Sequence, residues 1–161
     1  MDRVRIFGHT LHAMLVVFPL GLLATSLVWD VVFLATGNLM WAQTGFWTIV
    51  AGLAGALLAA IPGFIDWLSI PRHTRAWRIG VYHLILNLIV VVLFAISAGL
   101  RLANAYGGYT APDVADMIPG WVALGLVVVS GWLGAELVER LGVGVHDDAN
   151  LNAPSSLRRR T

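Results

Sequence analysis

Four long apolar runs constrain this chain more than any other feature of its sequence. They cover roughly residues 11–35, 44–70, 79–102 and 118–138, and each reaches the roughly 20 residues that a helix needs to cross a bilayer. Only 12% of the 161 residues are charged, whereas a soluble domain of this size needs far more charge to cover its surface. The sequence therefore predicts an all-α polytopic membrane protein, a four-transmembrane-helix bundle.

The four runs also set the expected organisation of the chain. With allowance for caps and loops, helices are expected near residues 5–36, 43–70, 77–103 and 117–141. Residues 1–145 then form one transmembrane domain, and residues 146–161, which lose the apolar periodicity, form a disordered cytoplasmic tail. The first run follows two arginines, as in a signal peptide, but it is too long and lacks a cleavage pattern. It is therefore expected to be retained.

Arginine alone sets the predicted orientation, because the sequence contains no lysine. Four spans place both termini and the loop between the second and third helices on one face of the membrane. Every arginine except Arg101 lies on that face, and positive charge collects on the cytoplasmic side. Both termini are therefore expected in the cytoplasm. Since the chain has no cysteine, disulfides, thiolate metal ligands and c-type haem attachment are excluded.

Polar residues inside apolar runs are costly and point to function. Asp30 and Arg101 fall on the predicted outer side, and a larger group falls on the cytoplasmic side: His9, His12, Asp66, His73, His83, Asn87 and Glu136. If the first helix begins near Val4 and the third near Trp77, His83 lies about 9 Å along its helix from the cytoplasmic boundary, and His12 lies a similar distance along its own. The two imidazoles would then share a depth.

The spacing of these residues repeats. Asp30 follows His12 by eighteen residues, and Arg101 follows His83 by eighteen. Asp66 and Glu136 follow the same two histidines by fifty-four and fifty-three residues. This indicates two helical hairpins of the same orientation, related by a pseudo-twofold axis along the membrane normal. The repeat predicts that His12 faces His83 across the bundle and that Asp30 pairs with Arg101 in a structural ion pair.

Four stretches carry a family resemblance: HAMLVVFPLGLLATSLVWDVV, AAIPGFIDWL, YHLILNL and GWLGAELVERLGVGV, with a basic loop between the second and third. They resemble the DUF2231 family, small bacterial membrane proteins of undefined function, over roughly residues 9–145. The resemblance implies a multi-pass protein of the bacterial inner membrane. Because some members are fused to cytochrome c domains, it also implies a redox setting by association.

The family motifs are kept only in part. Members typically show HPMLVHFP in the first helix. This chain keeps the first histidine as His12 but carries Ala13 in place of the proline and Val17 in place of the second histidine. Two further motifs match, an H-x-x-x-N at His83 and Asn87, and a D-W at Asp66 and Trp67.

One hypothesis for the histidines is axial ligation of haem b by His12 and His83, because facing helices of a bundle hold such cofactors and neutral imidazole ligates iron. Asn87 would lie beside His83. Small residues would leave room for the porphyrin, and arginines of the basic loop would pair with its propionates. The small residues are Ala13, Gly63 and Gly80, and the arginines expected to pair with the propionates are Arg72, Arg75 or Arg78.

Two other interpretations stay open. A divalent metal ion would be held by His9, His12, His83 and Asp66, since histidines three residues apart share a helix face. In the third interpretation the histidines bind nothing and are hydrogen-bonded inside the bundle, with His83 bonded to Asn87 or Asp66.

The working prediction of function is a small inner-membrane protein with a histidine-framed cofactor site, holding haem b and linked to redox chemistry. The alternatives are a structural or assembly subunit without a cofactor and a transporter component. No nucleophile constellation stands out, so the chain is not expected to be an enzyme on its own. The expected partners are membrane lipids and a second copy or a larger membrane redox complex, with no nucleic acid.

Overall fold

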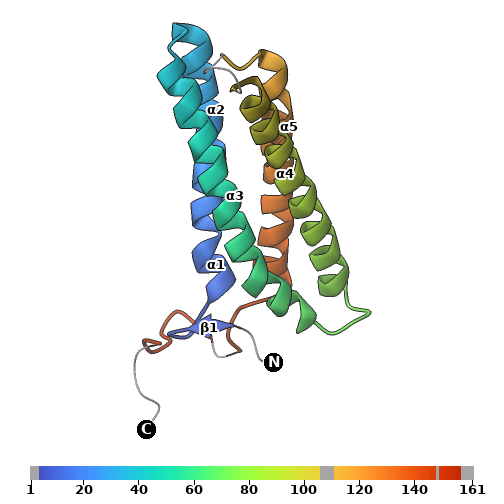
Figure 1. Cartoon of the computed structure of the whole chain (residues 1–161). Helices are drawn as coiled ribbons and strands as arrows, with labels where there is room; N and C mark the ends of the chain where they lie inside the picture. The colour runs from blue at the N-terminus through green and yellow to red at the C-terminus, as the bar shows by residue number, and fades with distance from the viewer. Residues whose placement is uncertain (1–3, 106–110, 148, 157–161) are drawn as a thin grey trace.

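Four helices that are long and apolar enough to cross a membrane form the bundle of the computed structural model, which describes residues 4–105, 111–147 and 149–156 (Figure 1). The first span combines α1 (Leu11–Leu15) and α2 (Val17–Thr36), and the last combines α5 (Val114–Ala135) with the π-helix η1 (Glu136–Arg140). Between them lie α3 (Leu39–Leu68) and α4 (Arg75–Ala105). The predicted four-helix membrane fold is confirmed.

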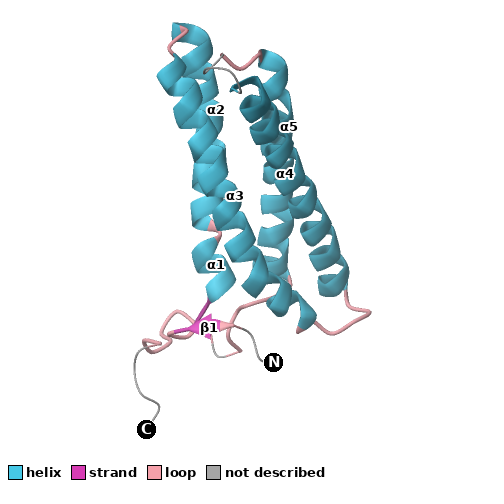
Figure 2. Cartoon of the chain, viewed as in Figure 1, coloured by secondary structure: helices cyan, strands magenta, loops and turns pink. Residues whose placement is uncertain are grey.

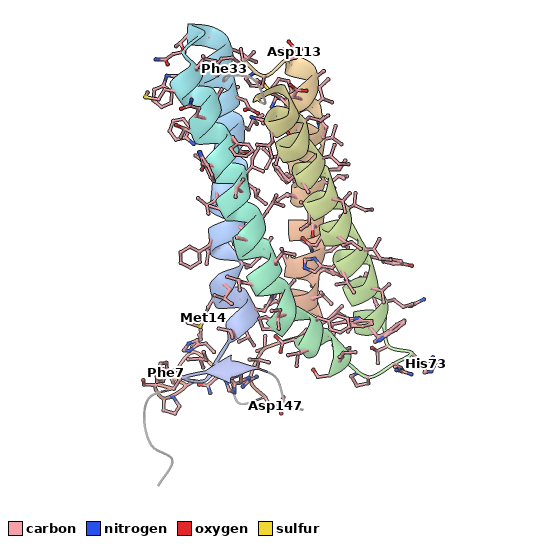
Figure 3. All side chains as sticks on the ribbon, viewed as in Figure 1. Phe7, Met14, Phe33, His73, Asp113 and Asp147 are labelled. Atoms are coloured by element: carbon pink, nitrogen blue, oxygen red, sulfur yellow. The ribbon has the colours of Figure 1, made fainter. Side chains whose placement is uncertain are left out.

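The two ends of the bundle differ in what they carry. The strand β1 (Arg5–Ile6) lies at one end, as do Phe7, His73 and Asp147, whereas Phe33 and Asp113 mark the opposite end (Figures 1 and 3). We call the half that carries Phe7, His73 and Asp147 the terminal half; it contains the N-terminal parts of α1 and α4 and the C-terminal part of α3. The other half, with the C-terminal parts of α2 and α4, is the distal half. The arginines at positions 3 and 158–160 lie outside the described residues.

The first helix does not start near residue 5, as the apolar pattern predicts, but at Leu11. Residues 5–10 instead form a β-hairpin of two short strands, β1 (Arg5–Ile6) and β2 (His9–Thr10) (Figure 2). Phe7 and Gly8 both have positive φ, 50° and 84°, which is the geometry of a two-residue hairpin turn. The hairpin is held to the bundle because the Val4 N–H donates to Asp66 Oδ1 over 3.2 Å.

The first span is interrupted at Val16, between α1 and α2. Helical bonding continues through the break, since the Val16 N–H donates to His12 O and the Leu20 N–H to Val16 O. Pro19 has no N–H to donate, so the helix loses a bond there. Pro19 is buried and lies against Gly55 of α3, where an added Cβ would come within 3.3 Å of its ring.

The spans pair into two helical hairpins. The first hairpin packs α1 and α2 on α3, and the second packs α4 on α5 and η1; α3 with α4 and α2 with α5 join the two. Apolar side chains from both hairpins meet in two clusters in the middle of the bundle and in its distal half. The larger contains Leu23, Ile49, Val90, Phe94, Ala98 and Ala123, and the smaller contains Phe33, Ala42 and Met117.

The two hairpins repeat each other at a fixed offset. Asp30 and Arg101, which pair across the bundle, are 71 residues apart, and buried positions recur at that same offset. Pairs of this kind are Pro19 and Val90, Leu23 and Phe94, Ser26 and Ser97, Ile49 and Gly120, Gly52 and Ala123, and Ala59 and Ser130. Because the same places in both hairpins face the interior, the predicted parallel repeat describes how the bundle packs.

The segment after η1 folds back over the β-hairpin. His146 Nε2 lies 2.8 Å from Gly8 O, and its Nδ1 lies 2.9 Å from Arg5 Nη1. The first residue of the predicted disordered tail is therefore bonded to the N-terminal segment. Residues 149–156 form neither helix nor strand, and for residues 157–161, which lie outside the described part, disorder stays a prediction.

Candidate functional site

His12 of α1 is bonded to the backbone of α3. Its Nδ1 lies 2.8 Å from Ala59 O, and because a carbonyl oxygen only accepts, the proton sits on Nδ1. In a neutral imidazole Nε2 then carries the lone pair. Gly63 makes this approach possible, since a Cβ there would lie 2.6 Å from His12 Nδ1. The bond therefore needs glycine one turn after the accepting carbonyl.

His83 of α4 repeats this arrangement on α5. Its Nδ1 lies 3.0 Å from Ser130 O and 3.2 Å from Ser130 Oγ. Gly134 again follows the accepting residue by one turn, and a Cβ there would lie 3.3 Å from His83 Cε1. Each histidine is separated from its acceptor by 47 residues, so the two bonds are equivalent under the repeat.

Together the two imidazoles form a matched pair in the terminal half. Both residues are half-buried. No polar atom in the described part of the chain is hydrogen-bonded to Nε2 of either ring. A histidine whose Nδ1–H is bonded to a carbonyl and whose Nε2 carries a lone pair is set up as a metal or haem ligand.

The other residues expected at the cofactor have partners of their own. Asn87 Nδ2 donates to the backbone oxygen of His83 over 2.8 Å, one turn back on the same helix, and does not bond the ring. Arg75 forms an ion pair of 2.5 Å with Glu136 of η1. Arg72 and Arg78 are exposed and have no ion pair within the described ranges. Among the arginines of the loop, these two are open to an added anion.

The four residues of the predicted metal site are not gathered in one place. His9 lies on β2, is exposed, and has Nδ1 3.1 Å from Phe7 O. Asp66 accepts the N–H of Val4. Within residues 4–105, 111–147 and 149–156, no three side chains of His, Cys, Asp or Glu are grouped to hold a metal ion. His12 and His83 are thus left as a two-imidazole set.

The expectation that small residues leave empty room for a porphyrin is wrong for two of them. The space beside Gly63 holds the His12 ring, and the space beside Gly80 holds Trp67, whose Cδ1 would lie 2.6 Å from an added Cβ. Ala13 is exposed on α1. The two glycines are needed because side chains of the chain itself pack against them.

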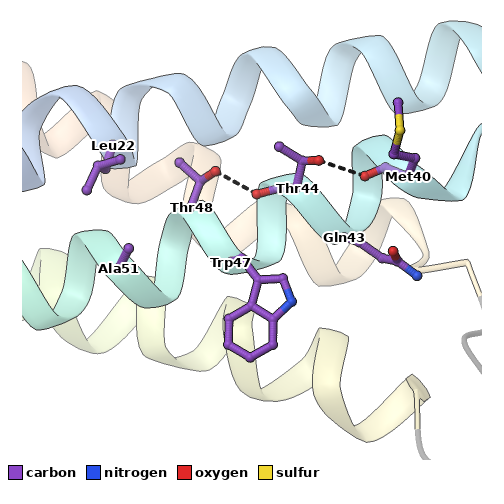
Figure 4. A pocket seen from close by; sticks show the side chains of 7 residues that line it. All are labelled: Leu22, Met40, Gln43, Thr44, Trp47, Thr48 and Ala51. Atoms are coloured by element: carbon purple, nitrogen blue, oxygen red, sulfur yellow. Dashed lines mark hydrogen bonds between the residues drawn. The ribbon is translucent and has the colours of Figure 1, made fainter.

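A groove on the outer face of α2 and α3 lies away from both histidines (Figure 4). It has a volume of about 470 Å³. The hydroxyls of Thr44 and Thr48 donate to the backbone carbonyls one turn earlier, so they offer few free donors to a ligand. The lining residues are Leu22, Met40, Gln43, Thr44, Trp47, Thr48 and Ala51.

The polar residues of the distal half form a closed network, and the predicted pairing of Asp30 with Arg101 is confirmed. Arg101 Nη1 and Nη2 donate to Asp30 Oδ1 and Oδ2 over 2.6 and 2.7 Å. Both side chains are at most 3% exposed. Trp121 Nε1 donates to Asp30 Oδ2, and Arg101 Nε donates to Ser97 Oγ, which itself donates to Asp116 O. The sequence analysis missed Ser97 and Trp121, although Ser97 repeats Ser26 at the 71-residue offset.

Residues 8–147 match the model of DUF2231, described as a predicted membrane protein. The chain belongs to the DUF2231 family. No curated protein and no solved structure matches it. The region matched to DUF2231 contains both imidazoles, their glycines and the distal ion pair, so all of these belong to the family domain.

Proposed function

We propose that this DUF2231 protein is a small subunit of the bacterial inner membrane that holds haem b between His12 and His83 and takes part in electron transfer. The observation that supports it best is the pair of equivalent Nδ1 bonds, to Ala59 O and Ser130 O. Each bond orients a ring and leaves the Nε2 lone pair as the ligand atom.

The number of ligands favours haem over a bare ion. A porphyrin supplies four of the six ligands of its iron, so two imidazoles complete the set. A divalent ion bound by protein alone usually takes three or four protein ligands, and the described residues group no such set. The two-imidazole donor set fits haem b.

Residues of the chain would hold haem in two ways, through the imidazoles at its iron and through arginines at its propionates. Since the imidazoles themselves fill the spaces beside Gly63 and Gly134, His12 and His83 would hold the haem through their free Nε2 atoms. Arg72 of the α3–α4 loop and Arg78 in the first turn of α4 would pair with the propionates, since Arg75 is already paired with Glu136. When bound, haem supplies one-electron redox chemistry, and the protein supplies orientation and a medium of low polarity.

The redox partner would lie outside this chain. The chain has no cysteine for a second covalent cofactor, and a single haem passes electrons only between other carriers. We therefore place the protein in a larger membrane redox complex or in a homodimer, with membrane lipids around it and both termini in the cytoplasm. It would not be an enzyme on its own.

A second candidate function is a structural or assembly subunit without a cofactor. It is favoured by one observation: the spaces beside Gly63 and Gly80 are filled by His12 and Trp67. In this view the two histidines only clamp α1 to α3 and α4 to α5.

Absorbance of the purified protein separates these candidates. Protein expressed with haem available and purified in detergent should show a Soret band and, on reduction, an α-band, and both should be lost in His12→Ala and in His83→Ala. His9→Ala is the matched control, because His9 is exposed on the β-hairpin, and it should keep the spectrum. Colourless wild-type protein would contradict haem binding and leave the assembly function. Metal analysis of the same sample and a flux assay in liposomes test the ion-binding and transporter alternatives.

A further inference from the structure

The distal ion pair joins equivalent positions of the two hairpins. Asp30 and Arg101 are 71 residues apart, as are His12 and His83. Residues at equivalent positions that touch must lie on the pseudo-twofold axis that relates the hairpins. Two identical charged residues would repel each other at that point, whereas an acid and a base attract. The pair thus marks the axis of the bundle.

The pair is directional in a way that the apolar clusters are not. Both Asp30 oxygens accept from Arg101, and Ser97 and Trp121 hold the two partners from the side. A two-point bond between planar groups fixes position as well as adding energy. Burial of apolar surface is non-directional, so apolar packing alone would tolerate a slip of one hairpin along the other.

Few other hydrogen bonds between the hairpins control this slip. The His12 bond stays inside the first hairpin and the His83 bond inside the second. Within the described parts of the spans, the hydrogen bonds between hairpins are those on Asp30 and one of 3.4 Å from Trp67 Nε1 to Trp77 O, beside the α3–α4 loop. Within the spans, the register between hairpins is therefore controlled mainly in the distal half; at the terminal end, the bonds of Arg5 and Gly8 to His146 join only the segments that flank the spans.

We propose that Asp30 and Arg101 are positioning residues, which set the axial register of the two hairpins and hold His12 and His83 at one depth. Each histidine precedes its member of the pair by eighteen residues on the same span, about 27 Å along a helix. Since the first span and α4 run in the same direction, equal depth at the pair gives equal depth at the imidazoles. A slip of one helical turn would offset the rings by about 5.4 Å.

That the register serves to align the two histidines for haem rests on the proposed function, but the register itself can be measured without haem. The chain has no cysteine, so two introduced cysteines can carry spin labels without interference. Ala13→Cys on α1 and Tyr82→Cys on α4 are exposed positions next to the two histidines. Electron–electron double resonance on this labelled protein in liposomes should give one narrow distance.

Arg101→Gln and Asp30→Asn, made in the labelled protein, should broaden that distance, because hairpins that slip by up to one helical turn, about 5.4 Å along the axis, no longer hold the two labels at one fixed offset. Glu136→Gln is the matched control, because the Arg75–Glu136 pair lies inside the second hairpin and should leave the distance unchanged. A folded Arg101→Gln protein with the parent distance would overturn the proposal. If neither variant folds, Arg101→Lys, which keeps the charge but not the two-point bond, decides: a broadened distance supports the proposal and an unchanged one overturns it.

The outcome is independent of the test for haem. Colourless protein with a distance that responds to Arg101→Gln would refute haem binding and support the positioning role. If the protein binds haem, and neither the label distance nor the haem content changes in Arg101→Gln, haem binding is supported and the positioning role is refuted.

Discussion

The distal and terminal halves of this bundle use polar residues in opposite ways. In the distal half, Asp30, Arg101, Ser97 and Trp121 bond one another in a closed, buried network. In the terminal half, His12 and His83 each use one ring nitrogen inside the protein and keep the other without a partner among the described residues. A polar group inside a membrane is costly unless it is paired. The comparison teaches that the distal residues satisfy one another, whereas Nε2 of each imidazole has no partner among the described residues, which is the feature on which the proposed haem site rests.

The largest expected effect comes from breaking the distal network. Asp30→Leu leaves the Arg101 charge buried without its partner, and such a break costs about 3–5 kcal/mol. The free energy of unfolding in mixed micelles measures it. Because the unpaired charge is the cause, Asp30→Leu combined with Arg101→Leu should recover much of the loss. A cost below about 1 kcal/mol for the single variant would show that the network is not what holds the distal half.

The next largest effect should come from Gly63→Ala. The new Cβ would lie 2.6 Å from the His12 ring, and overpacking of this kind costs about 1–3 kcal/mol. Gly134→Ala should cost less, because its contact with His83 is 3.3 Å. Gly131→Ala is the control, since nothing lies within 4 Å of its added Cβ. Equal unfolding free energies for Gly63→Ala and Gly131→Ala would argue against the His12–Ala59 bond.

The histidines themselves should matter little for stability. His12→Phe and His83→Phe each remove one hydrogen bond to a carbonyl, and bonds between membrane helices average about 0.6 kcal/mol. Haem binding should nevertheless be lost in both variants. Unfolding measured beside the haem spectrum separates the two roles. A cost above about 3 kcal/mol, comparable with a broken buried ion pair, would favour the assembly function.

The smallest effect is expected at the Arg75–Glu136 pair. Arg75 is 55% exposed, so solvent screens the attraction, and Glu136→Gln should cost about 0–1 kcal/mol. Added salt should reduce the difference from wild type further. A larger, salt-independent loss would mean that η1 depends on this pair for its position.

Much of the fold could be predicted from the sequence, because the length of an apolar run is a direct consequence of bilayer thickness. The Asp30–Arg101 pair could be predicted too, since equal spacing from two histidines marks equivalent positions. The start of the first helix could not. The six residues RIFGHT lack the usual hairpin turn of Asn-Gly or Asp-Gly. Distant residues hold the segment, since Asp66 accepts from Val4, just before β1, and His146 is bonded to Gly8 O in the turn.

The acceptors of the two histidines were beyond sequence analysis for a different reason. Any residue has a backbone carbonyl, so Ala59 and Ser130 carry no signal of residue type. Gly63 and Gly134 are the sequence features that accompany these contacts, but a glycine in an apolar span is usually explained by helix packing. Arg75 was expected at a cofactor, yet the structure places it beside Glu136 at the start of the π-helix η1, a local change of helix type that periodicity does not reveal.

The central claim is that both imidazoles offer Nε2 to one shared ligand in the terminal half. Titration of the purified apoprotein with haem tests it most directly. The account predicts saturation at one haem per chain with a six-coordinate, low-spin spectrum, and loss of that spectrum in His12→Ala and His83→Ala alike. Absence of saturable binding, or the same low-spin spectrum in either variant, would contradict it.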